Sequence, residues 1–292
     1  MKKGQASRTA EYVALFRAIE SALPSGRRLF EDPYAEHFLS PPLALVARLA
    51  RLPGVADLVS AFIDRRWAGA RSWVVARTRL IDDRLIDALT RGIGQVVILG
   101  AGFDSRAYRL SRLRGVPIFE VDHPDTLARK QRVLAAASID VPSNIRFVAT
   151  DFHVGDLDAA VAEAGYSAEV PTFLLWEGVT AYLTASAVDA TLRWCARAAS
   201  GSELLFTYVH RAILDDPGAF AGTGRLSTAL QAAGERWTFG LDPAELRSYL
   251  RDRGLDLEED VGSADYSARY LPRLSERIRD YDFFRLAIAK VP

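Results

Sequence analysis

The chain has 292 residues, of which 49% are hydrophobic, 37 are lysine or arginine and 37 are aspartate or glutamate. This length and composition exclude a disordered or fibrous protein and favour one large α/β core with an additional terminal region. Because the formal net charge is zero, the chain as a whole has no field that attracts nucleic acid or an anionic membrane, and we expect it to bind neither. Zero net charge still leaves room for a local basic patch.

Cysteine and histidine usage argues against cross-links and metal sites. Cys195 is the single cysteine, so no intrachain disulfide is expected, and the four histidines lack the spacing of metal ligands. The two lysines near the N-terminus are not followed by the apolar segment of a signal peptide. The longest apolar stretches are interrupted by Arg48, Arg51 and Asp57, which makes them too short to span a bilayer. We therefore expect a cytoplasmic protein.

Residues 1–90 show helical periodicity and few signals for strands. Apolar residues recur every three or four positions over residues 12–19 and again over residues 58–89, with a break near Gly69. The pattern predicts an N-terminal helical cap over residues 1–90, placed before the sheet.

Strands and helices alternate after residue 95. Short runs of aliphatic residues without polar alternation predict strands that are buried on both faces. The predicted strands cover 95–100, 117–122, 145–149, 170–176 and 202–208, and the helices between them cover 104–113, 124–138, 156–164 and 184–199. This alternation indicates a parallel, doubly wound sheet with right-handed crossovers.

The rest of the chain is expected to complete a domain over residues 91–292. Residues 210–240 form a long connection and predict a lid inserted over the carboxyl edge of the sheet. A helix is expected to begin at Asp242, because a cap residue, a proline and an acid follow in the order of a helix N-terminus. Two further strands are predicted at 255–261 and 283–289, the last as an antiparallel addition.

The first predicted strand leads directly into a glycine turn. Gly100 and Gly102 provide a tight turn and a bare backbone, which allow a nucleotide-like ligand to approach the carboxyl end of the strand. A dinucleotide-binding fingerprint has a third glycine where this chain has Ser105. The glycine pair alone therefore does not separate a ligand site from an ordinary strand-to-helix turn.

Acidic residues follow the next three strands. Asp122 ends the second strand, where a carboxylate can accept hydrogen bonds from both hydroxyls of a ribose. Asp151 follows the third strand, where it either contacts an adenine amino group, with Phe152 covering the ring, or caps a helix. Glu177 follows the fourth strand and can pair with a cationic group of a ligand. A ribose, an adenine and a cationic centre occur together in S-adenosylmethionine.

In these residues the chain resembles the leucine carboxyl methyltransferase family, in the branch with bacterial and polyketide O-methyltransferases. The resemblance rests on several motifs that stand in order between residues 76 and 183. These motifs are Ala76-Arg77-Thr78-Arg79, Gly100-Ala101-Gly102-Phe103-Asp104-Ser105-Arg106, Phe119-Glu120-Val121-Asp122-His123-Pro124, Lys130, Thr150-Asp151-Phe152 and Trp176-Glu177-Gly178-Val179-Thr180-Ala181-Tyr182-Leu183. The resemblance implies a class I methyltransferase fold, which is a doubly wound α/β sheet of seven strands, and bound S-adenosylmethionine.

The resemblance also implies roles for single residues. It assigns Arg77 to the carboxylate of the cofactor, Asp122 to the ribose and Glu177 to the α-amino end. From the residues alone, Arg77 would be an exposed arginine of a helix. The expected cofactor-binding residues are Arg77, Gly100, Ala101, Gly102, Asp122, His123, Asp151, Phe152 and Glu177. We expect Asp104 and Arg106 to form a local ion pair that shapes the turn.

Methyl transfer to a carboxylate, or to a hydroxyl, of a small-molecule acceptor is the expected reaction. A carboxylate is ionised at pH 7 and needs no base, whereas a hydroxyl usually does. His210, after the fifth strand, is the best placed base, and Tyr182 is the second candidate for a catalytic residue. Tyr208, Trp237 and Phe239 are candidates for the acceptor pocket, or else belong to the core.

Two alternatives remain at this point. An NAD-dependent oxidoreductase shares the first strand, the glycine turn and Asp122 with the methyltransferase interpretation. A protein that binds the cofactor without turnover is the non-enzymatic alternative. The oligomeric state is not predicted.

Overall fold

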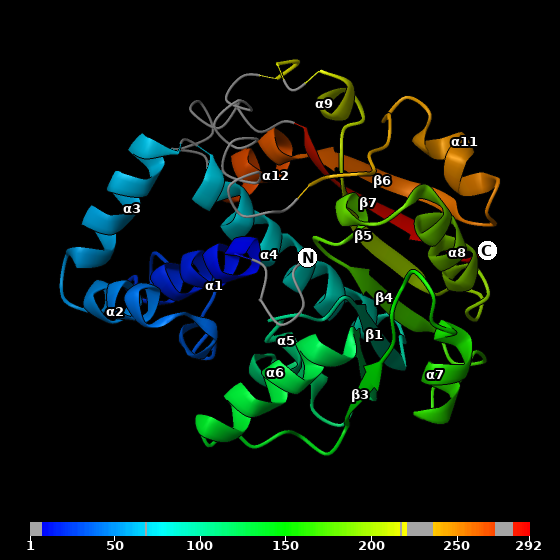
Figure 1. The fold of residues 1–292 in the computed structure, drawn as a ribbon, viewed down its shortest axis with the longest axis horizontal. Coiled ribbons are helices and arrows are strands. Elements are labelled where there is room, and N and C mark those ends of the chain that lie inside the picture. The colour runs from blue at the N-terminus through cyan, green and yellow to red at the C-terminus, as the bar shows by residue number, and fades with distance from the viewer. Residues whose placement is uncertain (1–7, 68, 217, 221–235, 272–282) are drawn as a thin grey trace.

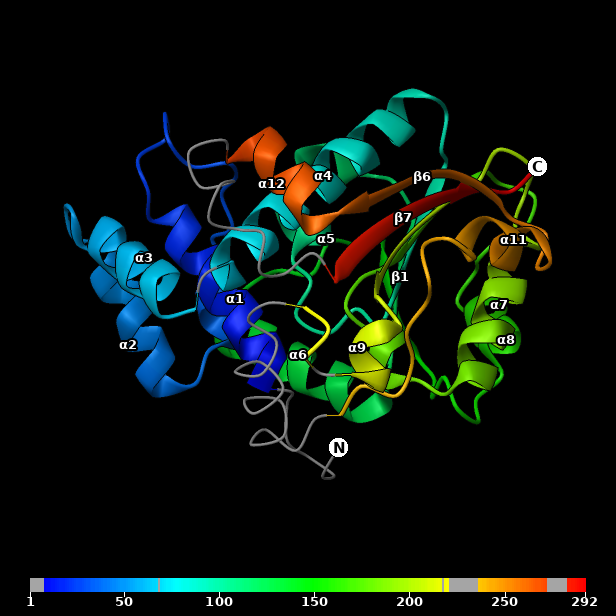
Figure 2. The ribbon, with the colours of Figure 1, turned by 90° about the horizontal axis from the view of Figure 1, so that it is seen from above.

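The structure, a computed structural model, describes residues 8–67, 69–216, 218–220, 236–271 and 283–292. Before the first strand it contains the α-helices α1 (Arg8–Ser21), α2 (Pro41–Ala50), α3 (Val55–Arg66) and α4 (Ala70–Thr90) and the 3₁₀ helix η1 (Ala35–Phe38). The break expected near Gly69 is confirmed, because Gly69 caps α4 with φ +89°, a backbone conformation that favours glycine. Both views show α2 and α3 side by side at the periphery, away from the sheet (Figures 1 and 2).

One sheet of seven strands has the order β3-β2-β1-β4-β5-β7-β6. Its strands are β1 (Gln95–Leu99), β2 (Ile118–Asp122), β3 (Ile145–Ala149), β4 (Thr172–Trp176), β5 (Glu203–Val209), β6 (Asp256–Gly262) and β7 (Phe284–Lys290). Strands β1 to β5 pair in parallel, and β7 pairs antiparallel with both β5 and β6. The expected class I methyltransferase sheet with an antiparallel last strand is confirmed.

Helices cover both faces of this sheet (Figure 2). On one face α4 packs with α12 (Ser263–Tyr270), and on the other lie α7 (Leu157–Glu163), α8 (Ala185–Cys195) and α11 (Leu246–Arg251). Strand β1 is fully buried. Its Val96 and Ile98 side chains belong to the core on the α4 side of the sheet, and its Val97 and Leu99 side chains belong to the core on the side of α7, α8 and α11. Because α4 shares its core with the sheet, the division into a cap over 1–90 and a domain over 91–292 stays a prediction.

Three predicted helix boundaries are wrong. The predicted helix over 104–113 is divided into α5 (Arg106–Arg109) and η2 (Ser111–Leu113). The first helix after β2, α6 (Pro124–Ala136), ends two residues early because Ser138 adopts φ +52°. α8 ends at Cys195 rather than 199, since the following turns tighten to three-residue hydrogen bonds.

The helix expected at Asp242 also begins later, at Leu246. The Asp242 carboxylate accepts a hydrogen bond from the backbone N–H of Ala244 at 2.9 Å, and the Asp242 carbonyl accepts one from Glu245 at 3.0 Å. A side-chain turn therefore competes with the helix for these groups. Of the expected lid over 210–240, the structure describes 210–216, which include α9 (Ala212–Asp215), 218–220 and 236–240, whereas 217 and 221–235 lie outside the described residues.

A fully buried ion pair connects β2 to α6. The Lys130 ammonium lies 2.7 Å from the Glu120 carboxylate, and it also donates a hydrogen bond to the Asp104 carbonyl at 2.7 Å. Burial raises the pKa of Glu120 to about 6, although Lys130 lowers it in part. The pair therefore joins α6 and β2 to the turn that follows β1.

The raised pKa of Glu120 predicts a pH-dependent stability. A carboxyl that binds its proton more tightly in the folded state stabilises the fold at low pH, and this stabilisation is lost as the pH rises from 4.5 through about 6. Relative to Glu120→Gln, the wild-type free energy of unfolding should fall by about 2 kcal/mol between pH 4 and 7, measured by urea denaturation. Glu258→Gln, in the exposed pair with Lys290, is the control. A pH-independent difference between wild type and Glu120→Gln would contradict this account.

Candidate functional site

The strand order places the sequence-predicted residues at one edge of the sheet. Asp151, Asp122, Gly100 and Glu177 follow the adjacent strands β3, β2, β1 and β4 at their carboxyl ends. From β1 the chain adds β2 and β3 toward one edge of the sheet, and it then adds β4 and β5 toward the other edge. The switch point therefore lies between β1 and β4, which is where open α/β sheets bind ligands.

The glycine turn is fixed by packing and by backbone hydrogen bonds. The N–H groups of Gly100 and Ala101 donate to the Val121 carbonyl at 2.8 and 3.0 Å. Gly100 has φ +70°, and a Cβ atom there would lie 2.3 Å from the Val179 side chain. Gly102 has φ +40° and more open surroundings. Gly100 is therefore needed for the close approach of the loop after β4, and Gly102 for its backbone conformation.

Asp122 is held by two backbone N–H groups. Its carboxylate oxygens accept hydrogen bonds from Gly102 and from His123, each at 2.6 Å. Burial raises the pKa of Asp122, and the two N–H groups partly oppose this effect. The Thr126 side chain also hydrogen-bonds this carboxylate, so of about four acceptor positions one remains for a hydroxyl group. The exposed His123 ring accepts a hydrogen bond from the Asp125 N–H at 3.2 Å and thereby caps α6.

Asp151 stabilises a turn and not a helix. Its side chain accepts a hydrogen bond from the His153 N–H at 2.9 Å, whereas α7 is capped by Asp156. The helix-cap alternative for Asp151 is therefore not what the structure shows. Phe152 is half-buried, and its ring centroid lies 6.5 Å from that of Trp176 at the end of β4.

Glu177 lies between two buried arginines. The Arg77 guanidinium is 2.6 Å from one carboxylate oxygen, and the Arg106 guanidinium is 2.8 Å from the other. Burial alone would raise the pKa of Glu177, but the two arginines outweigh it and hold this pKa below its usual value. The Arg77 guanidinium also stacks on the Trp73 ring at 3.8 Å, and its Nε has no hydrogen-bond partner. Arg77 is thus buried, contrary to the expectation from the residues alone.

Arg106 is the centre of a wider buried network. The expected ion pair between Asp104 and Arg106 is confirmed, and Arg106 also lies 2.9 Å from Asp82 on α4. Arg109 contacts Asp82 at 2.7 Å. Although burial opposes it, Arg106 and Lys130 lower the pKa of Asp104 to about 2. The network therefore joins α4 and the glycine turn to Glu177.

Sequence reasoning missed Asp82 and Arg109. Asp82 lies on the same helix as Arg77, one residue outside the apolar pattern, and resembles any acid on an exposed helix face. The signal that was available is the clustering of Arg77, Asp104 and Arg106 in two short motifs. Two arginines with one acid need further acidic partners if they are buried.

The catalytic candidates occupy different surroundings. His210 follows β5 directly, and its Nδ1 accepts a hydrogen bond from the Ala212 N–H at 3.1 Å. Tyr182 is half-buried in η3 (Thr180–Tyr182), the short 3₁₀ helix after β4. Tyr208 and Phe239 are buried in the core, and the Tyr208 hydroxyl donates to Asp260 at 2.9 Å.

The Trp237 ring packs against the rings of Phe283 and Phe284, with centroids 5.8 and 5.5 Å apart.

The described residues contain no group of three or more histidine, cysteine, aspartate or glutamate side chains that could hold a metal ion. Among these residues, no helix is long and apolar enough to cross a bilayer.

One family of known proteins matches more than half of this chain. A family model described as leucine carboxyl methyltransferase matches residues 10–196. This chain belongs to the leucine carboxyl methyltransferase family. The match includes Arg77, the glycine turn, Asp122, Asp151 and Glu177, and confirms the resemblance seen in the sequence.

Relatives of this chain have S-adenosylmethionine in their names. It is 36% identical over 203 residues to a Parafrankia sp. (strain EAN1pec) protein named "Putative S-adenosyl-L-methionine-dependent methyltransferase", covering 68% of this chain and 61% of that protein. A protein of that name from Mycolicibacterium smegmatis is 35% identical over 257 residues, covering 86% of this chain and 73% of the relative. The chain is therefore an S-adenosylmethionine-dependent methyltransferase, and the oxidoreductase alternative is not favoured.

Solved structures agree on the fold. A DUF574 family protein from Streptomyces avermitilis has a TM-score of 0.59 at 17% identity, with 98% of this chain and 99% of that chain covered. A protein from Thermobifida fusca, titled a putative methyltransferase, has a TM-score of 0.57 at 16% identity, with 99% and 96% covered.

The side chains at the carboxyl edge fit S-adenosylmethionine chemically. Asp122 keeps an acceptor position for a ribose hydroxyl, and Arg77 has a buried Nε without a partner. Glu177 is held anionic beside a cation, as a ligand with both an ammonium and a carboxylate group requires.

The network around Arg106 predicts a large loss of stability when it is broken. Arg106→Met leaves three buried carboxylates with one cation fewer and should lower the free energy of unfolding by about 3–5 kcal/mol. Arg193→Met removes an exposed pair with Asp189 and should cost less than about 1 kcal/mol. Urea denaturation followed by circular dichroism compares the two. Equal losses would show that the buried network does not stabilise the fold.

Proposed function

We propose that this protein transfers the methyl group of S-adenosylmethionine to a carboxylate of a small-molecule acceptor. The observation that carries the choice of a carboxylate is the state of His210. Its Nδ1 already accepts a hydrogen bond from the Ala212 N–H, so the lone pair that a general base would use at this nitrogen is occupied. A carboxylate acceptor is ionised at pH 7 and needs no such base.

The cofactor roles that we propose follow from the donors and acceptors at the sheet edge. When bound, the cofactor supplies a methyl group on a positively charged sulfur. Asp122 accepts hydrogen bonds from the ribose, and Asp151 and Phe152 contact the adenine. Gly100, Ala101 and Gly102 make room for the methionine moiety, and His123 borders the ribose. The enzyme's contribution is then mainly alignment of the reactants and exclusion of water.

Arg77 and Glu177 would hold the two charged ends of the methionine moiety. In the structure these side chains pair with each other at 2.6 Å. A zwitterion replaces this internal pair by two new pairs of the same signs, so the number of unpaired buried charges does not change. This exchange favours a ligand that carries both an ammonium and a carboxylate group.

The exchange predicts a non-additive effect of two substitutions. Glu177→Gln leaves the buried Arg77 without its ion-pair partner, and Arg77→Gln leaves Glu177 with Arg106 alone. Each substitution should weaken binding of S-adenosylhomocysteine about thirtyfold or more. The double variant should bind less weakly than the product of the two single effects, as measured by isothermal titration calorimetry. Arg79→Gln, on the same helix but in a half-exposed pair with Asp83, is the control. Additive effects would contradict the exchange.

The acceptor class can be tested with the radiolabelled cofactor and panels of small carboxylic acids, phenols and alcohols. We expect base-labile methyl esters, which release methanol, and not stable methyl ethers. His210→Asn keeps an acceptor for the Ala212 N–H and should lower kcat less than about threefold, whereas loss of a general base would lower it about 100-fold or more.

Two other outcomes would decide against the proposal. Ether products together with a large loss in His210→Asn would assign a hydroxyl acceptor and make His210 the base. Tight binding of S-adenosylhomocysteine without methyl transfer to any acceptor would favour a cofactor-binding protein without turnover.

A further inference from the structure

Helix α2 buries three alanines and leaves two of its leucines exposed. Ala44, Ala47 and Ala50 are buried, and the partly buried Leu43 and Val46 pack against the core of the N-terminal helices to which Ala47 and Ala50 belong. Leu45 and Leu49, one helical turn apart, are 56% and 46% exposed. Burying a leucine is worth about 1.5–3 kcal/mol, so folding of this chain alone gives no reason to leave these two leucines in water.

Helix α3 also leaves two large apolar side chains exposed. Its buried face consists of Ala56, Ser60 and Ile63, whereas Leu58 and Phe62 are 71% and 65% exposed. These two side chains are again one turn apart and lie on the same face.

The exposed apolar residues of the protein are concentrated here. Nine large hydrophobic residues are exposed in the described part of the chain, and six of them lie between residues 45 and 67. We call these six the α2–α3 surface: Leu45, Leu49, Leu52, Leu58, Phe62 and Trp67. Such a concentration marks an interaction site, whereas single exposed apolar residues do not.

Arginines are interspersed with this surface by helical spacing. Arg48 follows Leu45 by three residues, and Arg65 and Arg66 follow Phe62 by three and four residues, so each lies on the apolar side of its helix. All three are exposed, and the Arg66 guanidinium lies 5.1 Å from the ring centroid of Trp67.

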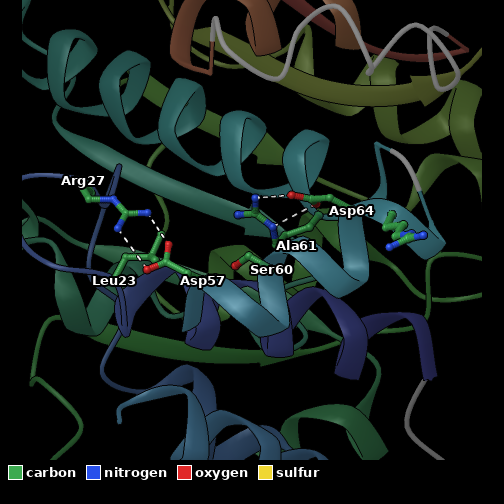
Figure 3. Close-up of a pocket in the computed structure, with 8 residues that line it drawn as sticks. Leu23, Arg27, Asp57, Ser60, Ala61 and Asp64 are labelled. Carbon is green, nitrogen blue, oxygen red and sulfur yellow. Dashed lines mark hydrogen bonds and ion pairs between the residues drawn. The ribbon is translucent and has the colours of Figure 1, made fainter. Parts of the chain in front are cut away.

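The acids of α3 do not balance these charges. Asp57 and Asp64 line a pocket of about 600 Å³ between the helices and pair there with Arg27 and Arg71 from other elements (Figure 3). Both acids are therefore already paired with arginines from outside α2 and α3, and Arg65 lines the same pocket.

The remaining charges leave an excess of positive charge. Arg48 and Arg51 share the single carboxylate of Glu36, at 2.8 and 2.6 Å. Arg65 and Arg66 form no ion pair with any acid in the described part of the chain. The zero net charge of the whole sequence thus conceals a local surface that is both apolar and cationic.

We propose that the α2–α3 surface docks the protein onto an anionic lipid membrane. Leucine, phenylalanine and tryptophan next to arginine are the composition of helices that lie in the plane of a membrane interface. Tryptophan and arginine also suit the headgroup region, where one part of the side chain is apolar and the other is wet. The helices lie on the surface and do not span the bilayer, consistent with their length and charge.

A second copy of the chain fits this surface less well. A symmetric contact through the α2–α3 surface would bring the same arginines of two molecules together, with no described acid on the surface to pair them. An anionic layer of headgroups neutralises all of them at once.

The test uses the full chain and flotation of lipid vesicles. We expect binding to vesicles of phosphatidylglycerol and phosphatidylcholine but not to phosphatidylcholine alone, and weaker binding at high salt. Leu58→Ser with Phe62→Ser should reduce vesicle binding at least about tenfold. Arg65→Gln with Arg66→Gln should reduce it about fivefold for each arginine. Both variants change exposed residues, so their thermal melting should equal that of the wild type.

Val154→Ser is the matched control, because Val154 is 85% exposed and lies far along the chain near α7. It should bind vesicles as the wild type does. Absence of vesicle binding, equal binding to neutral vesicles, or unchanged binding by the Leu58 and Phe62 variant would overturn the proposal. A dimer in light scattering that the same variant converts into a monomer would also overturn it, because a second copy would then cover the surface.

Discussion

A buried carboxylate between two buried guanidinium groups is the constraint on which the site depends. Glu177 follows β4, Arg77 belongs to α4 and Arg106 follows the glycine turn after β1. Moving such charges out of water costs several kcal/mol each, so the fold is acceptable only if all three segments arrive together. The helix α4 is therefore part of the site itself, even though it precedes the sheet in sequence.

A second buried ion pair, between Glu120 and Lys130, helps to fix the arginines and the carboxylate in place. Lys130 neutralises Glu120 and also donates to the Asp104 carbonyl, while the Asp104 side chain pairs with Arg106. A line of alternating charges thus extends from the middle of β2 to the end of β4. Each member restricts the rotamers of the next, which gives Glu177 a fixed position without any bound ligand.

The sequence predicted the sheet and the ends of its strands well, because strands buried on both faces are continuous apolar runs and their first polar residues mark the edge. It could not predict that Asp82 joins Arg106, since that contact links distant segments. It also could not orient α2 and α3. Periodicity reveals that Leu58 and Phe62 share a face, but not whether that face points inward. At Asp242 a local side-chain turn prevailed over a good helix-start pattern.

Strand β7 has a consequence for how this protein is made. β7 pairs with β5 on one side and with β6 on the other, so β5 and β6 do not pair with each other. While the ribosome is still synthesising the segment before Phe284, β5 presents an open edge of backbone N–H and carbonyl groups. The nascent chain therefore carries an unpaired strand edge while residues 210–283 are synthesised. β7 covers this edge when it inserts between β5 and β6, which were both made before it.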